Sequence, residues 1–149
     1  MIHIGIDPGS SSGAIAKVFS DDETVPYVAD MLQLSKATQR DIYDFLREDT
    51  EDTHSALLEK VNAMPGQGVS STFKFGCSFG ELRMALVATH IPFELVTPAK
   101  WQREMGCLSG GDKKITRRRA QELFPAEKIP HWKADAILLA ELARRRTVR

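Results

Sequence analysis

Acidic residues stand in three segments of this sequence that are otherwise apolar. Asp7 ends an alternating apolar segment, Glu59 ends a continuous one, and Asp135 lies within the apolar residues 134–140. A carboxylate costs free energy to bury unless another group pairs with it. If the fold brings these three together, cations must neutralise them, and clustered oxygen ligands suit Mg²⁺ or Mn²⁺. His131 precedes Asp135 by four residues, so both lie on one face of a helix.

Simpler interpretations of these residues stay open from the sequence. Asp7 precedes Pro8-Gly9, so its carboxylate can accept backbone N–H groups of a turn. Glu59 can end its strand and point to solvent. His131 can be an N-terminal helix residue without a role. The choice depends on the elements that position them.

The first of these elements is a tight hairpin. Apolar residues at positions 2, 4 and 6 alternate as in a strand, Pro8-Gly9 marks a turn, and a second apolar run covers 14–19. The further elements expected are a strand at 25–31, a helix at 38–47, a strand at 54–62, a helix at 72–89, a strand at 91–96 and helices at 98–106, 113–124 and 131–146. Ser70 or Ser71, Thr97 and Asp112 are the expected N-caps. This order indicates an α/β sheet that opens with a meander.

Composition is that of one globular domain. The chain has 149 residues, of which 42% are hydrophobic and 27% charged. No apolar run approaches the ~20 residues of a membrane span, and no secretory signal is visible. Cys77 and Cys107 match no zinc or redox spacing, which fits a cytosolic protein.

Charge is unevenly distributed although its sum is zero. Residues 113–149 hold eleven Lys and Arg against four Asp and Glu. A basic segment of this kind favours a polyanionic partner, although a solvated helix face has the same composition.

Three motifs in order resemble the RuvC family of Holliday-junction resolvases. They are Ile4-Gly-Ile-Asp-Pro-Gly-Ser10, Leu57-Leu-Glu59 and His131-Trp-Lys-Ala-Asp-Ala136. The stretch Met64-Pro-Gly-Gln-Gly-Val-Ser-Ser71 is similar to the short, phage-encoded RuvC-like branch. The resemblance implies one α/β domain over residues 1–149 with an RNase H-like fold, a five-stranded mixed sheet flanked by helices.

The resemblance also implies a mechanism. Asp7, Glu59 and Asp135 would hold two Mg²⁺ ions, with Asp7 bridging them and Mn²⁺ able to substitute. His131 stands one residue before the position where many bacterial relatives carry another acid or His, and we expect it to be a further catalytic ligand. The reaction would be paired hydrolysis of a four-way DNA junction that leaves 5′-phosphates and 3′-hydroxyls.

Partners follow from the same resemblance. Two-fold cleavage requires a homodimer, expected to form on the helix at 72–89, where Gly76 and Gly80 permit close packing. Bacterial relatives carry an aromatic wedge where this chain has Asn62, and Phe73 or Phe75 could replace it. The basic residues expected to bind DNA phosphates are Lys100, Lys113, Lys114, Arg117, Arg118 and Arg119.

Other functions compete with this one. A flap or branched-DNA nuclease of phage replication or packaging would use the same residues. An actin-like phosphotransferase would need a second lobe, and a non-catalytic nucleic-acid-binding module would not need three acids. No membrane partner is expected, and the site of action would be the cytoplasm of a bacterium or a phage-infected bacterium.

Overall fold

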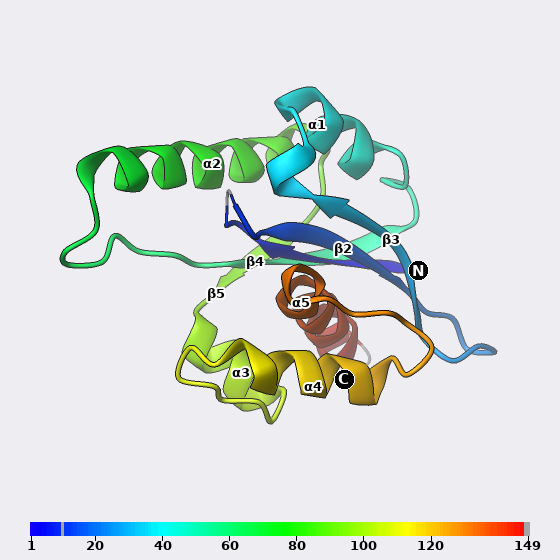
Figure 1. The fold of residues 1–149 in the computed structure, drawn as a ribbon. Helices are drawn as coiled ribbons and strands as arrows, with labels where there is room; N and C mark the ends of the chain where they lie inside the picture. The colour runs from blue at the N-terminus through cyan, green and yellow to red at the C-terminus, as the bar shows by residue number, and fades with distance from the viewer. Residues whose placement is uncertain (10, 148–149) are drawn as a thin grey trace.

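A five-stranded mixed sheet separates two layers of helices in the computed structural model, which describes residues 1–9 and 11–147 (Figure 1). The spatial order of the strands is β3-β2-β1-β4-β5. Their bounds are β1 Ile2–Asp7, β2 Ala14–Phe19, β3 Tyr27–Gln33, β4 Thr53–Glu59 and β5 Phe93–Val96. The predicted five-stranded mixed sheet is confirmed.

The opening hairpin has the predicted form. β1 and β2 pair antiparallel from Ile2 opposite Phe19 to Asp7 opposite Ala14. The turn closes with the Gly13 N–H donating to the Gly9 carbonyl at 2.6 Å. A Cβ on Gly13 would collide with the backbone of Asp7 and Gly9, so the turn requires glycine there. The third strand lies two residues later than expected, at Tyr27–Gln33.

Helices cover both faces of the sheet. α1 (Gln39–Arg47) and α2 (Val69–Ala88) lie on one face, and α3 (Pro98–Glu104), α4 (Lys113–Leu123) and α5 (His131–Thr147) lie on the other, with α5 directly against the sheet (Figure 1). A 3-10 turn covers Leu34–Lys36. Each face has its own apolar core, and within the described residues no helix is long and apolar enough to cross a bilayer.

Local capping chemistry starts α1 and α4 but not α2 and α3. Thr97 is the N-cap residue of α3, as expected, but its side chain makes no capping hydrogen bond. Thr38 forms a capping box with Asp41, and the Asp112 side chain accepts the Lys114 N–H. α2 begins three residues before its expected start, and its N-cap is Gly68 instead of Ser70 or Ser71. Glycine is tolerated at the N-cap position, and no side chain accepts the first N–H groups of α2.

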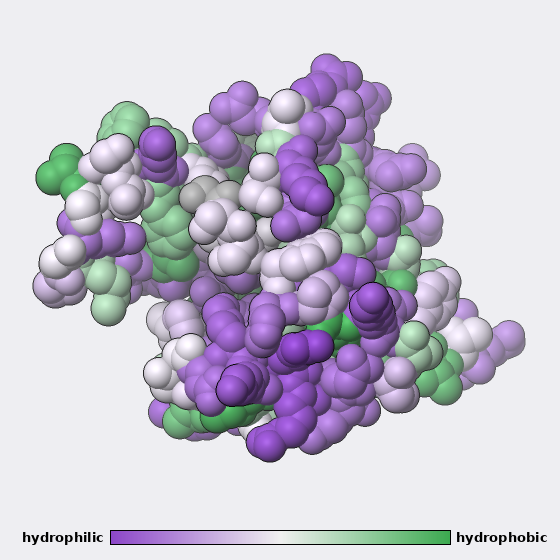
Figure 2. All heavy atoms as spheres, in the orientation of Figure 1, coloured by the Kyte–Doolittle hydropathy of each residue, from purple (hydrophilic) through white to green (hydrophobic). Residues whose placement is uncertain are grey.

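The first half of α2 extends past the sheet (Figure 1). Leu82 and Leu86, near the other end, are its buried residues, whereas Phe73 is 72% exposed. A Cβ on Gly76 or Gly80 would meet no atom within 4 Å. Figure 2 shows hydrophobic surface at this overhanging end. The face is open for a partner.

Gly5 sets the distance between the sheet and α5. A Cβ on Gly5 would collide with backbone atoms of Ala136, Leu139 and Ala140. Backbone cannot rotate away as a side chain can, so only glycine permits this approach. The contact places the middle of α5 against β1.

Gly5→Ala is expected to destabilise the fold by about 3 kcal/mol or more, the upper range for overpacking a core. Thermal unfolding should then show a Tm roughly 10 °C lower. Gly76→Ala is the control, because the added methyl meets nothing in α2 and Ala favours helix by about 1 kcal/mol. Equal Tm values for the two variants, at one protein concentration, would contradict the close contact.

Candidate active site

Asp7 and Glu59 end two adjacent parallel strands. The register pairs Ile6 of β1 with Leu58 of β4, so the next residues, Asp7 and Glu59, lie side by side. Ile6 and Leu58 belong to the core beneath α1 and α2. Successive side chains alternate between faces, so both carboxylates point to the opposite face, toward α5.

Asp135 meets them from α5. Its side chain is 5% exposed, and its Oδ2 accepts the ammonium of Lys113, the first residue of α4. Its Oδ1 is buried and has no hydrogen-bond partner in the described structure. Glu59, Lys113 and Asp135 line one cavity of about 350 Å³, together with Pro98, Ala99, Gln102, Leu108, Gly110 and Gly111.

Trp101 holds Glu59 in place. The fully buried indole of Trp101, on α3, donates its Nε1–H to Glu59 Oε2 at 2.6 Å. Glu59 therefore does not point freely to solvent. Sequence reasoning missed this role, although an indole N–H buried in a short helix needs an acceptor and this is a usable signal.

Burial and neighbouring carboxylates raise the pKa values of Asp7 and Glu59. Burial, and then the charge of Asp135, raise the pKa of Asp7 to about 6, despite the opposing charge of Lys113 and the Gly9 N–H bonded to Asp7 Oδ1 at 3.3 Å. Burial, and then Asp7, raise the pKa of Glu59 to about 7. Asp7 therefore caps its turn and also belongs to a cluster in which the negative charges outnumber the positive one.

Other buried charges of the described residues are paired. Lys17, 1% exposed, binds Asp49 at 2.5 Å, and Glu141 binds Arg144 at 2.8 Å and Arg145 at 2.7 Å. The acidic cluster has only Lys113 against three carboxylates. An uncompensated cluster of this kind is costly to fold and is typical of functional sites.

The cluster fits a divalent cation by its chemistry. Its donors are carboxylate oxygens, and the unpartnered Asp135 Oδ1 is an acceptor that a cation would satisfy. Among the described residues no three His, Cys, Asp or Glu side chains are yet arranged around a common metal position. The Lys113 ammonium lies on Asp135 instead.

Known proteins match this chain in structure. Neither a family model nor a curated protein sequence matches this chain. RuvC of Thermus thermophilus has a TM-score of 0.72 at 14% identity, with 99% of this chain and 97% of that chain covered. The same RuvC in complex with a Holliday junction substrate gives 0.70. The chain has the fold of RuvC.

Two other resolvases share the RuvC fold. The yeast mitochondrial Holliday junction resolvase Ydc2 has a TM-score of 0.58 at 14% identity, covering 97% of this chain and 78% of that chain. The fowlpox virus Holliday junction resolvase has 0.55 at 14% identity, with both chains fully covered. The predicted RNase H-like fold is confirmed.

His131 is not among the residues that line the cavity beside the acidic cluster. It is exposed at the first turn of α5. A ligand role for His131 stays a prediction.

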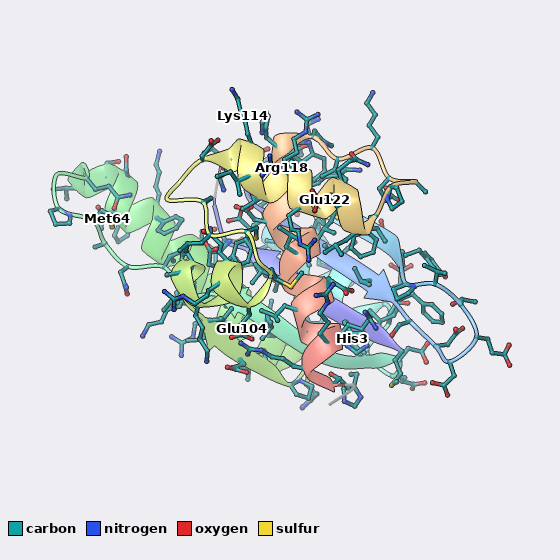
Figure 3. All side chains as sticks on the ribbon, turned by 90° about the horizontal axis from the view of Figure 1, so that it is seen from below. His3, Met64, Glu104, Lys114, Arg118 and Glu122 are labelled. Carbon is teal, nitrogen blue, oxygen red and sulfur yellow. The ribbon has the colours of Figure 1, made fainter. Side chains whose placement is uncertain are left out.

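The six basic residues expected to bind DNA differ in the contacts that they make within this RuvC fold. Lys113 contacts the acidic cluster, whereas Arg117 donates to the Ile129 carbonyl at 2.8 Å and Arg119 to the Met105 carbonyl at 2.9 Å. Lys114 and Arg118 extend from the outer face of α4 (Figure 3) and have no ion-pair partner among the described residues. Lys100 on α3 is exposed and lies 3.9 Å from Glu94.

The raised pKa of Asp7 predicts a pH-dependent stability. A carboxyl whose folded pKa lies above its unfolded value stabilises the fold below pH 4, and this contribution is lost as the pH rises through about 6. In metal-free buffer at pH 7.5, Asp7→Asn should therefore raise the Tm, by at least about 3 °C. The gain should shrink at pH 5, where folded Asp7 is largely protonated. If thermal denaturation shows the same gain in Tm at both pH values, the charge of Asp7 does not destabilise the fold.

Proposed function

We propose that this chain is a structure-selective endonuclease that resolves four-way DNA junctions by metal-dependent phosphodiester hydrolysis. The observation that carries the proposal is the meeting of Asp7, Glu59 and Asp135 in one acidic cluster of the RuvC fold, beside a cavity that Glu59 and Asp135 line, with a buried carboxylate oxygen left unpartnered. Several proteins of this fold are Holliday junction resolvases. Three uncompensated acids also distinguish this site from a passive DNA-binding surface, which they would repel.

The chain's own residues would position the reaction. Asp7, Glu59 and Asp135 would hold two Mg²⁺ ions, which when bound supply an activated water and stabilise the departing 3′ oxygen. Trp101 fixes one oxygen of Glu59 at 2.6 Å, so this carboxylate keeps its orientation before a metal arrives. His131, one turn before Asp135, would be the remaining ligand. The products would be a 5′-phosphate and a 3′-hydroxyl.

DNA would lie along α4 beside the cavity. Lys114 and Arg118 line a surface groove of about 410 Å³ with Arg117, Gln121 and Glu122. Figure 2 shows hydrophilic surface over the lower part of the molecule, where α3 and α4 lie. Phosphate contacts would give affinity and register without reading sequence. Lys100 is exposed for the same role on α3.

A second copy of this chain would pack on the overhanging half of α2. Gly76 and Gly80 have open space above them, and the neighbouring Phe73 is 72% exposed. Two sites related by a two-fold axis would then cut opposed strands of a four-way junction. Phe73, exposed close to this end, is the better-placed candidate for the aromatic wedge.

Synthetic four-way junctions, flaps and linear duplexes with Mg²⁺ test the proposed function. We expect paired, symmetrically placed nicks in the junction, little cutting of the duplex, and no cutting in EDTA. Asp7→Asn should bind the junction and leave it at least ~10³-fold less cut, since it removes a carboxylate from the metal site. Equal cutting of flap and junction would instead favour the branched-DNA nuclease.

Binding of an uncut junction at several salt concentrations tests the α4 surface. Lys114→Ala with Arg118→Ala should lower the slope of log affinity against log salt by roughly 0.9 for each phosphate that the protein no longer neutralises, with little change in Tm. Arg119→Ala is the matched control, because this side chain holds the Met105 carbonyl and its removal should lower the Tm. If the double variant keeps the wild-type slope, the α4 surface does not face DNA.

A further inference from the structure

Lys113 lies where a cation is required. It is the first residue of α4, and its position is fixed by the N-cap Asp112 and by the preceding Gly110 and Gly111, whose φ angles are 58° and 97°. From there its ammonium crosses the cavity to Asp135 on α5. Two elements of the fold thus direct a positive charge into the acidic cluster.

The positive charge of Lys113 interacts with all three carboxylates. Burial alone would lower the pKa of Lys113, but the hydrogen bond and charge of Asp135, and the charges of Asp7 and Glu59, raise it above its ordinary value. The ammonium is thus the positive charge that compensates this cluster in the metal-free protein. It occupies Asp135 Oδ2 and leaves Oδ1 unpartnered.

Lys113 and Asp135 are unequally buried, and this favours replacement of the ammonium by a metal ion. The Lys113 side chain is 54% exposed, whereas that of Asp135 is 5% exposed and held within the α5 core. A divalent cation on Asp135 would face a like charge a few ångströms away unless the ammonium moved. Lysine has a long, flexible side chain and can swing to solvent, while the carboxylate stays in place.

We propose that Lys113 is an internal counter-ion, which occupies the metal position on Asp135 in the metal-free protein and is displaced when a divalent cation binds. The inference rests on the proposed metal-dependent function. Lys113 then has two positions: on Asp135 before metal binding, and at the open mouth of the cavity afterwards.

Calorimetric titration with MnCl₂, without DNA, tests the exchange. Lys113→Met removes the competing charge and should tighten Mn²⁺ binding about tenfold. The metal-free Tm should fall, because three carboxylates lose their one counter-ion, and the gain in Tm with Mn²⁺ should exceed that of the wild type. Lys113→Gln can still hydrogen-bond Asp135, so it serves as the second variant if Lys113→Met does not fold without metal. It should bind Mn²⁺ as tightly as Lys113→Met does.

Two controls separate exchange from general electrostatics. Lys113→Arg keeps the charge and should bind Mn²⁺ as the wild type does. Lys114→Ala removes the adjacent charge, which extends from the outer face of α4 (Figure 3) and does not line the cavity, and should leave Mn²⁺ affinity within about twofold. Unchanged or weaker Mn²⁺ binding by both neutral Lys113 variants would overturn the proposal. If the wild type itself binds no Mn²⁺, the proposed metal-dependent function fails instead.

Discussion

The close contact between Gly5 and α5 is the constraint on which the rest of the structure depends. Backbone atoms of Ala136, Leu139 and Ala140 lie where a side chain at position 5 would be. The contact holds the middle of α5 against β1, with Gly5 two residues from Asp7. Without it, Asp135 would stand farther from the strand carboxylates, and the three acids would not form one cluster.

The closeness of the three carboxylates has an electrostatic cost. Buried charges elsewhere in the described chain are paired, Lys17 with Asp49 and Glu141 with Arg144 and Arg145. At the cavity one ammonium faces three carboxylates, and the pKa values of Asp7 and Glu59 rise to about 6 and about 7. The fold accepts this electrostatic strain because packing on both faces of the sheet supplies stability independent of it. Under the proposed function, a bound cation would relieve this strain.

The basic helix α4 shows how one run of like charges serves different purposes. Arg117 and Arg119 fasten α4 to the loops at Ile129 and Met105, Lys113 enters the acidic cluster, and Lys114 and Arg118 face outward. A helix turns by about 100° per residue, so consecutive residues cannot share one surface. Side chains that fasten the helix and side chains that face outward are therefore interleaved along the same seven residues.

The sequence by itself determined the local structure and the identity of the acids. The alternating residues of β1, the Pro8-Gly9 turn, the caps at Thr38 and Asp112, and the three carboxylates in apolar segments all depend on neighbours in the chain. These are short-range effects, and they predict strands, helices and unusual residues well. The opening hairpin was accordingly predictable, whereas the RNase H-like fold was predicted from the resemblance of three motifs to the RuvC family.

Only the tertiary structure decided which groups share the cavity. The bond from Trp101 to Glu59 and the ion pair from Lys113 to Asp135 join residues 42 and 22 positions apart on different elements. No pattern in the sequence distinguishes Lys113 from Lys114, because both are lysines on the same exposed turn. Their different roles follow from the direction in which each side chain leaves the helix, and this depends on how α4 packs against α5.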